Sequence, residues 1–123
     1  MMAARSGSIV NVASEASMRG AAAGVAYTAA KHAVAGLTKN TAVLYAGHGI
    51  RVNAVAPGPT ITAIQGGMRS QHAASVLGPL MQVMLPKPVE ADVMAASIAW
   101  LASDDSANVT GVILPADGGW SAI

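Results

Sequence analysis

Three short apolar segments, separated by longer segments with helical character, constrain the fold of this chain more than any other feature. The apolar segments lie at residues 8–13, 50–56 and 111–115, and they are nearly continuous instead of alternating with polar residues. Strands of this kind are typical of parallel sheets, in which helices cover both faces. We therefore expect an α/β fold in which right-handed crossovers make the three strands neighbours or near neighbours.

Helical segments lie between these strands. From residue 25 to residue 46 proline is absent, glycine is sparse and apolar residues recur at every third or fourth position, which predicts a helix about 30 Å long. A further helix is expected at residues 89–102, after the Pro-Lys-Pro sequence that breaks the chain. Residues 60–85 contain glycine and methionine without a clean period, so we expect short helices and mobile loops there.

The first residues of the sequence read as the end of a helix. Residues 1–5 favour a helix, and Gly7 follows at a position where glycine commonly ends one. A chain that opens on the last turn of a helix suggests a sequence that begins inside a domain. We therefore expect residues 1–123 to form a single, partial domain.

The composition excludes several classes of function. A net charge of +1 gives no electrostatic basis for binding nucleic acid or an anionic membrane. The absence of cysteine excludes disulfides, thiolate catalysis and cysteine-based metal sites. His32, His48 and His72 are widely spaced, with no carboxylate at ligand spacing on a shared helix face, so we expect no metal site. There is no apparent signal peptide and no apolar run of membrane length, so we expect a cytoplasmic protein.

Tyr27 and Lys31 are the first candidates for chemistry. They are four residues apart and therefore lie on one face of the expected helix, one turn from each other. A lysine ammonium near a phenol favours the phenolate, which suits the pair to exchange a proton with an alcohol or carbonyl oxygen. Taken alone, a tyrosine and a lysine at this spacing are more often part of a solvated helix face, so the neighbouring residues decide the interpretation.

Two segments beyond strand ends supply those neighbours. Ser14 directly follows the first expected strand, and Pro57 and Gly58 follow the second. Ligands of open parallel sheets bind beyond the carboxyl ends of the strands. We therefore expect Ser14 to lie at the same rim of the sheet as Tyr27 and Lys31.

Other residues near this rim have simpler interpretations. We expect Glu15, beside Ser14, to be a solvated loop residue, and residues 117–119 to form a turn. The methionine-containing segment at residues 68–84 is either a substrate lid or adaptable packing.

Together, these residues resemble the short-chain dehydrogenase/reductase family. The resemblance is carried by Ser14, by Tyr27 thirteen positions later, by Lys31, and by the segments RVNAVAPG at residues 51–58 and GVILPADGG at residues 111–119. It covers almost the whole chain. It implies a partial Rossmann-like fold, with three parallel strands and flanking helices that form the C-terminal part of a doubly wound sheet.

The resemblance also implies a role for each residue. By it, Tyr27 is the catalytic acid/base, Lys31 supports Tyr27 and hydrogen-bonds the nicotinamide ribose, and Ser14 holds and polarises the substrate oxygen. The implied reaction is hydride transfer between NAD or NADP and a small-molecule secondary alcohol or ketone. The cofactor-binding residues implied in the same way are Tyr27, Lys31, Pro57, Gly58, Thr60 and Thr62.

The sequence departs from the family in one respect. The glycine-rich cofactor loop, the residue beside the adenine ribose and the Asn-Asn-Ala-Gly stretch, which the family carries in its N-terminal half, are not among the 123 residues. Gly47 and Gly49 stand between a helix and a strand, the reverse of the context that dinucleotide binding needs. We therefore expect a truncated, catalytic half that holds the reactive residues without most of the cofactor site.

Two interpretations of function stay open. The first is an NAD(P)-dependent oxidoreductase with a Ser-Tyr-Lys site. The second is a catalytically inactive remnant that acts as an oligomerising module through residues 25–46 and 111–115, which form oligomer interfaces in the family. An apolar content of 53% with 11% charged residues indicates that another chain covers part of the surface. We expect a homo-oligomer or association with a full-length relative, which the unpaired edge of the strand at residues 8–13 also favours.

Overall fold

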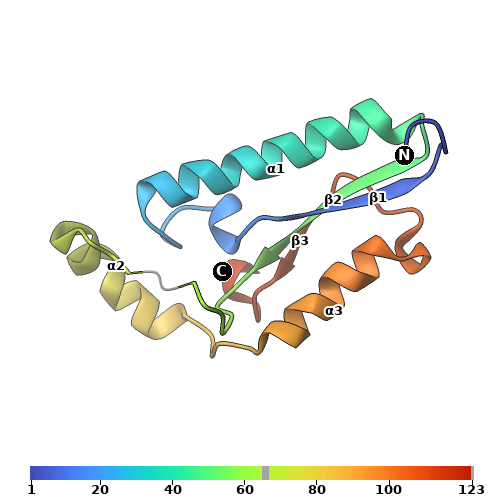
Figure 1. Ribbon diagram of the computed structural model, residues 1–123. Helices are drawn as coiled ribbons and strands as arrows, with labels where there is room; N and C mark the ends of the chain where they lie inside the picture. The colour runs from blue at the N-terminus through green and yellow to red at the C-terminus, as the bar shows by residue number, and fades with distance from the viewer. Residues whose placement is uncertain (65–66, 123) are drawn as a thin grey trace.

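A parallel sheet between helices forms the body of the structure (Figure 1). The structure is a computed structural model that describes residues 1–64 and 67–122. The elements, in chain order, are β1 (Gly7–Val12), η1 (Glu15–Ser17), α1 (Val25–Ala46), β2 (Ile50–Pro57), α2 (Gln71–Met84), α3 (Ala91–Ala102), η2 (Asp104–Ser106), β3 (Ile113–Ala116) and η3 (Trp120–Ala122). The α/β class and the order of strands and helices predicted from the sequence are confirmed.

The three strands lie side by side in the order β1-β2-β3, and both pairs are parallel. In the register, Val12 pairs with Val55 and Ala54 pairs with Ile113. The strand β2 is therefore central, which explains why most of its residues are buried. The carboxyl ends of β1 and β2 meet at one rim, and this rim positions the candidate site.

Helices cover the two faces of the sheet and create a small core on each. Figure 1 shows α1 along one face and α3 along the other. On the side of α1, Ala42 packs with Ile50 and Val52. On the side of α3, Val55 packs with Met94 and Leu101. The predicted helix at residues 25–46 is found with those bounds, but its buried face consists of Ala35, Thr38 and Ala42. Leu37 and Leu44, which belong to the predicted apolar spacing, are exposed instead.

Two polar residues of β2 explain why its apolar sequence is interrupted. Arg51 donates to the carbonyls of Leu101 and Ser103 at 2.9 and 2.8 Å, so its charge stands at the C-terminal end of α3, where a cation is favoured. Asn53 is fully buried, donates to the carbonyl of Val109 at 2.8 Å, and accepts from the amide of Val112 at 3.1 Å. Arg51 thus ties the central strand to the end of α3, and Asn53 ties it to the segment that enters β3.

The prediction that residues 1–7 form the end of a helix is wrong. Residues 2–5 form a turn in which the amide of Arg5 donates to the carbonyl of Met2 at 3.1 Å, and Arg5 has a φ of 48°. Gly7 begins β1, where it pairs with Ile50, instead of ending a helix. The reason is non-local: strand pairing with β2 sets the backbone at Gly7, whereas helix propensity considers only sequence neighbours.

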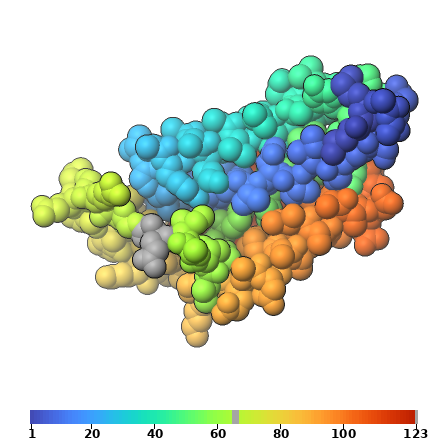
Figure 2. Space-filling model, in the orientation of Figure 1, coloured from blue at the N-terminus to red at the C-terminus, as the bar shows by residue number. Residues whose placement is uncertain are grey.

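The segment at residues 60–85 also differs from its prediction. In place of short helices it contains one helix of 14 residues, α2, which the hydroxyl of Ser70 caps by accepting from the amide of Ala73 at 3.2 Å. Pro79 lies inside this helix, and none of the helix residues is buried. Gln65 and Gly66, within the same predicted segment, lie outside the described residues. Figure 2 shows α2 projecting from the body formed by the sheet, α1 and α3.

Part of the surface is apolar. Four large aliphatic side chains of α1 are well exposed, namely Val25, Leu37, Val43 and Leu44. Among the described residues, β1 pairs with β2 alone, so the other edge of β1 carries no strand partner. Across residues 1–64 and 67–122, no helix combines the length and hydropathy needed to cross a bilayer.

Candidate active site

A cleft of about 360 Å³ lies at the carboxyl ends of β1 and β2. Its walls come from the end of β1, the first turns of α1, the segment after β2 and one side of α3. All seven site residues named from the sequence line it: Ser14, Tyr27, Lys31, Pro57, Gly58, Thr60 and Thr62. Side chains up to 48 positions apart in the sequence are thus brought around one space by the parallel sheet.

Ser14 is fixed between the sheet and the short helix η1. The preceding residue, Ala13, donates its amide to the carbonyl of Val55 at 2.8 Å, which continues the pairing of β1 with β2. The hydroxyl oxygen of Ser14 accepts from the amide of Ala16 at 3.2 Å and caps η1. A hydroxyl that accepts one hydrogen bond still has a proton to donate, so Ser14 can donate to an oxygen in the cleft.

Tyr27 and Lys31 lie in the first two turns of α1. The Nζ atom of Lys31 lies 5.5 Å from the centre of the Tyr27 ring and donates to the carbonyl of Val12 at 3.0 Å. Tyr27 is 47% exposed, so a small molecule can reach it. Because an ammonium has three donors, Lys31 keeps donors for a further partner while it stays tethered to the end of β1.

The segment after β2 forms the opposite wall. The amide of Gly58 donates to the carbonyl of Ala116 at 3.1 Å, and the hydroxyl of Thr60 donates to the carbonyl of Gly58 at 3.1 Å. Thr60 also forms an isolated bridge with Val89. Thr62 is exposed, and its hydroxyl oxygen accepts from the amide of Ile64 at 3.3 Å. Among the described residues, the hydroxyl proton of Thr60 therefore has an acceptor, whereas that of Thr62 is available to a ligand.

Gly58 is required by packing. A Cβ atom at this position would lie 2.7 Å from the Cα of Asp117, which is backbone and has little room to move. We expect Gly58→Ala to lower the free energy of unfolding by about 1–3 kcal/mol and to shift the wall of the cleft. Gly36→Ala is the matched control, because a Cβ there meets nothing within 4 Å. The control should raise stability by up to about 1 kcal/mol in a helix. Urea unfolding of both variants checks this, and equal effects would contradict it.

Glu15 is not a solvated loop residue, which corrects the sequence-based expectation. It is 1% exposed, and its carboxylate forms an ion pair with Arg19. Burial raises the pKa of Glu15 above its ordinary value of 4.5, while Arg19 lowers it in part and the charge of Asp117 raises it further. Arg19 also donates to the carbonyl of Trp120 at 3.1 Å and lies 5.3 Å from the centre of that indole ring. The spacing of four residues between Glu15 and Arg19 is a sequence signal for their ion pair. The sequence contains no comparable signal for the contact between Arg19 and Trp120.

Asp117 forms the turn that was expected at residues 117–119. Its carboxylate accepts from the amides of Gly119 and Ser121 at 3.0 and 2.9 Å. Gly118 and Gly119 have φ values of 66° and 88°, which favour glycine. Burial alone would raise the pKa of Asp117, but the hydrogen bonds from Ser121 and Gly119 outweigh it, and the pKa is lowered from 3.8.

This pKa predicts a stability that depends on pH. A carboxyl group with a lowered pKa in the folded state stabilises the fold above its unfolded pKa, and this contribution is lost as the pH falls through the folded pKa. Asp117→Asn should therefore lower the free energy of unfolding at pH 7 by about 1–3 kcal/mol, and the difference from wild type should shrink below about pH 4. Glu15 is the ionisable group that faces Asp117.

Urea unfolding at several pH values measures this difference. Asp105→Asn, at an exposed carboxylate, is the control and should change stability by less than about 0.5 kcal/mol. A difference for Asp117→Asn that stays constant from pH 7 to pH 3 would contradict the prediction.

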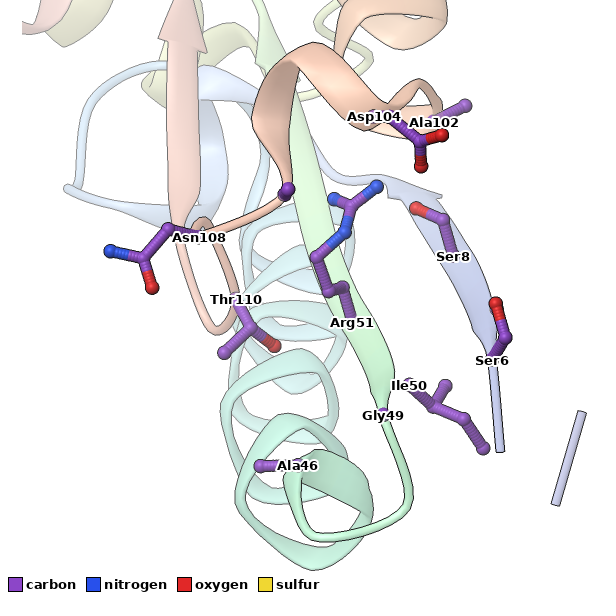
Figure 3. Close-up of a pocket in the computed structure, with 12 residues that line it drawn as sticks. Ser6, Ser8, Ala46, Gly49, Ile50, Arg51, Ala102, Asp104, Asn108 and Thr110 are labelled. Carbon is purple, nitrogen blue, oxygen red and sulfur yellow. The ribbon is translucent and has the colours of Figure 1, made fainter.

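A larger cavity, of about 480 Å³, lies at the opposite ends of the strands. Figure 3 shows Arg51 among the residues that line it, with Ser8 on one side and Asn108 on the other. The guanidinium of Arg51 donates hydrogen bonds to carbonyls at the end of α3 and to the hydroxyl of Ser106, the latter at 2.9 Å. This cavity therefore has a structural arginine and none of the candidate catalytic residues.

Comparison with known proteins identifies the family of this chain. The family model described as Enoyl-(Acyl carrier protein) reductase matches residues 1–121. A short-chain dehydrogenase from Rhodocybe pseudopiperita is 42% identical over 100% of this chain and 52% of its own length. The cis-4-hydroxycyclohexanecarboxylate dehydrogenase of Sinomonas cyclohexanicum is 45% identical over 100% of this chain and 48% of its own length. The chain belongs to the short-chain dehydrogenase/reductase family.

Solved structures of this family confirm the partial Rossmann-like fold. The short-chain dehydrogenase from Mycobacterium paratuberculosis bound to NAD has a TM-score of 0.84 and 35% identity, over 98% of this chain and 47% of that one. A structure from Agrobacterium tumefaciens with bound NADP has a TM-score of 0.78 and 37% identity, over 99% of this chain and 50% of that one. The chain thus spans about half the length of the short-chain dehydrogenases that it matches, and structural relatives hold NAD or NADP.

Proposed function

We propose that this chain supplies the catalytic part of an NAD(P)-dependent short-chain dehydrogenase, which transfers a hydride between a nicotinamide cofactor and a secondary alcohol or ketone. The observation that carries the proposal is the arrangement of Ser14, Tyr27 and Lys31 around one cleft, with the Lys31 ammonium 5.5 Å from the Tyr27 ring. The name of one relative, from Sinomonas cyclohexanicum, describes a hydroxyl on a ring carbon, which agrees with a secondary alcohol.

The proton of the reaction passes through Tyr27 in this proposal. Tyr27 takes the hydroxyl proton of the alcohol during oxidation and returns it to the carbonyl oxygen during reduction. The ammonium of Lys31 stabilises the negative charge that develops on the Tyr27 oxygen. Ser14 donates a hydrogen bond to the same substrate oxygen and polarises it. NAD or NADP, when bound, accepts or supplies the hydride.

The residues around the cleft suit a nicotinamide nucleotide. Lys31 keeps ammonium donors for ribose hydroxyls after its bond to Val12, and Thr62 keeps a hydroxyl proton for an amide or phosphate oxygen. Pro57 and Gly58 present backbone without a bulky side chain, so a flat ring can lie against them. Thr60 holds this wall through its bond to Gly58. These are the residues that would hold the nicotinamide end of the cofactor.

A second function, assembly with another chain, is favoured by specific surface features. Val25 and Val43 of α1 are 89% and 79% exposed, and the free edge of β1 offers backbone groups to a further strand. A second copy of this chain, or a full-length relative, is a partner that offers matching apolar side chains and a strand edge. Such assembly is compatible with catalysis and becomes the sole function if the chain binds no cofactor.

A fluorescence titration with NADH and NADPH, run beside size-exclusion chromatography, separates the two functions. Saturable binding at micromolar concentration, weakened by Lys31→Met and unchanged by Lys39→Met, supports the enzyme. Lys39 is the matched control because it is exposed on the same helix. Absence of binding together with self-association supports the assembly module. A monomer that binds neither nucleotide would contradict both.

A further inference from the structure

Arg19 joins two parts of the chain that are far apart in sequence. Its Nε atom pairs with the carboxylate of Glu15, one residue after Ser14. Its Nη2 atom donates to the carbonyl of Trp120, a residue 101 positions later, and the guanidinium lies over the Trp120 ring. One side chain therefore links the segment behind Ser14 to the C-terminal turn.

The link holds the segment of Ser14 in place because Glu15 is buried. Burial of a carboxylate is costly unless the charge is paired. Among the described residues, Arg19 is the side chain that pairs with Glu15, and the second carboxylate oxygen has no hydrogen-bond partner. Glu15 thus keeps its buried position through Arg19. Because Glu15 is the first residue of η1, this position also sets the place of its cap, Ser14.

The C-terminal turn contacts the opposite wall of the cleft as well. Asp117 lies so close to Gly58 that a Cβ atom on Gly58 would clash with its backbone. Trp120 donates its amide to the carbonyl of Asp117 at 3.3 Å, so the residues that contact Arg19 and Gly58 belong to one hydrogen-bonded turn. This turn therefore spans from the segment of Ser14 to the wall at Gly58.

We infer that Arg19 is a positioning residue, which holds Ser14 at a fixed distance from the Gly58 wall by joining Glu15 to the turn at Trp120. The inference rests on the proposed function only where it concerns catalysis. Its structural content, the local restraint of residues 14–18 by Arg19, holds whether or not the chain turns over a substrate.

Amide hydrogen exchange of the full 123-residue chain tests this restraint. In Arg19→Met, the amides of Ser17 and Met18, which donate to the carbonyls of Ser14 and Glu15, should exchange about tenfold faster than in the wild type. The amide of Ala54, in the buried central strand, should change far less. Arg19→Lys keeps the charge and should restore part of the protection.

Arg5→Met is the matched control, because Arg5 also donates to a carbonyl, that of Gly47 at 2.7 Å, but at the opposite ends of the strands. It should leave exchange at Ser17 unchanged. If Arg19→Met accelerates Ser17 and Ala54 equally, Arg19 acts on global stability alone and the inference is overturned. Unchanged exchange at Ser17 overturns it as well.

Kinetics separate failure of this inference from failure of the proposed function. If the chain shows NAD(P)-dependent turnover, Arg19→Met should lower kcat by up to about 10²-fold, because small misplacements of catalytic groups have effects of that size. The KM for the cofactor should change little. If the wild-type chain shows no turnover, the proposed function fails while the exchange result still decides the role of Arg19. A lowered kcat without faster exchange at Ser17 would overturn the positioning role.

Discussion

Replacing Tyr27 with phenylalanine is expected to lower turnover by about 10²–10⁴-fold, the range in which a single acid/base group contributes to catalysis. The variant loses the phenol proton and keeps the ring that lies beside the Lys31 ammonium. Cofactor affinity should change little, because the tether of Lys31 to Val12 and the wall at Gly58 do not depend on the hydroxyl of Tyr27.

The measurement is steady-state oxidation of a secondary alcohol, followed by NADH or NADPH absorbance, beside a nucleotide titration. It applies to this chain alone or combined with the N-terminal half of a full-length relative. Tyr45→Phe is the matched control, since Tyr45 lies on the same helix and packs against the core at Ile50 and Val52. Turnover retained in Tyr27→Phe would remove the acid/base role, and equal losses in both variants would indicate a structural effect.

Replacing Leu101 with alanine is expected to lower the free energy of unfolding by about 2–5 kcal/mol, because a buried leucine loses its packing and leaves a cavity. Leu101 is 0% exposed and belongs to the cluster with Val55 and Met94 that joins α3 to the sheet. Its backbone carbonyl accepts from Ser8 and Arg51 at 2.9 Å each. Loosening of this end of α3 should therefore also weaken those contacts.

Urea unfolding monitored by circular dichroism measures the change, with Leu80→Ala as control. Leu80 is 47% exposed on α2, a helix in which no residue is buried, so its loss should change stability by less than about 1 kcal/mol. A loss below 1 kcal/mol for Leu101→Ala, or equal losses in both variants, would contradict the assignment of the core.

Local patterns account for the parts of the fold that the sequence predicted. The bounds of α1 were predicted because its apolar spacing and its flanking glycines are properties of neighbouring residues. The strand that begins at Ile50 was predicted for the same reason, and its observed end at Pro57 lies one residue beyond the predicted end at Ala56. The strand order follows from general rules of parallel sheets and from the family resemblance.

Properties that depend on distant contacts were not predicted. The turn at residues 2–5 and the start of β1 at Gly7 are set by pairing with β2. The helix α2 is an exception, because none of its residues is buried and its cap at Ser70 is local; the proline inside it, Pro79, is the feature that argued against a single helix. The burial of Glu15 depends on an arginine whose other partner, Trp120, lies at the far end of the sequence.

The sequence alone determined the α/β class, the main helix and strands, and the identities of Ser14, Tyr27 and Lys31 as candidates. These follow from apolar period, from turn chemistry and from residue spacing, which are all local. Only the tertiary structure decided that the end of β1, the start of α1 and the segment after β2 line one cleft, and that Arg19 joins Glu15 to Trp120. The physical reason is that burial and pairing depend on which residues meet when the sheet forms, and those residues are far apart along the chain.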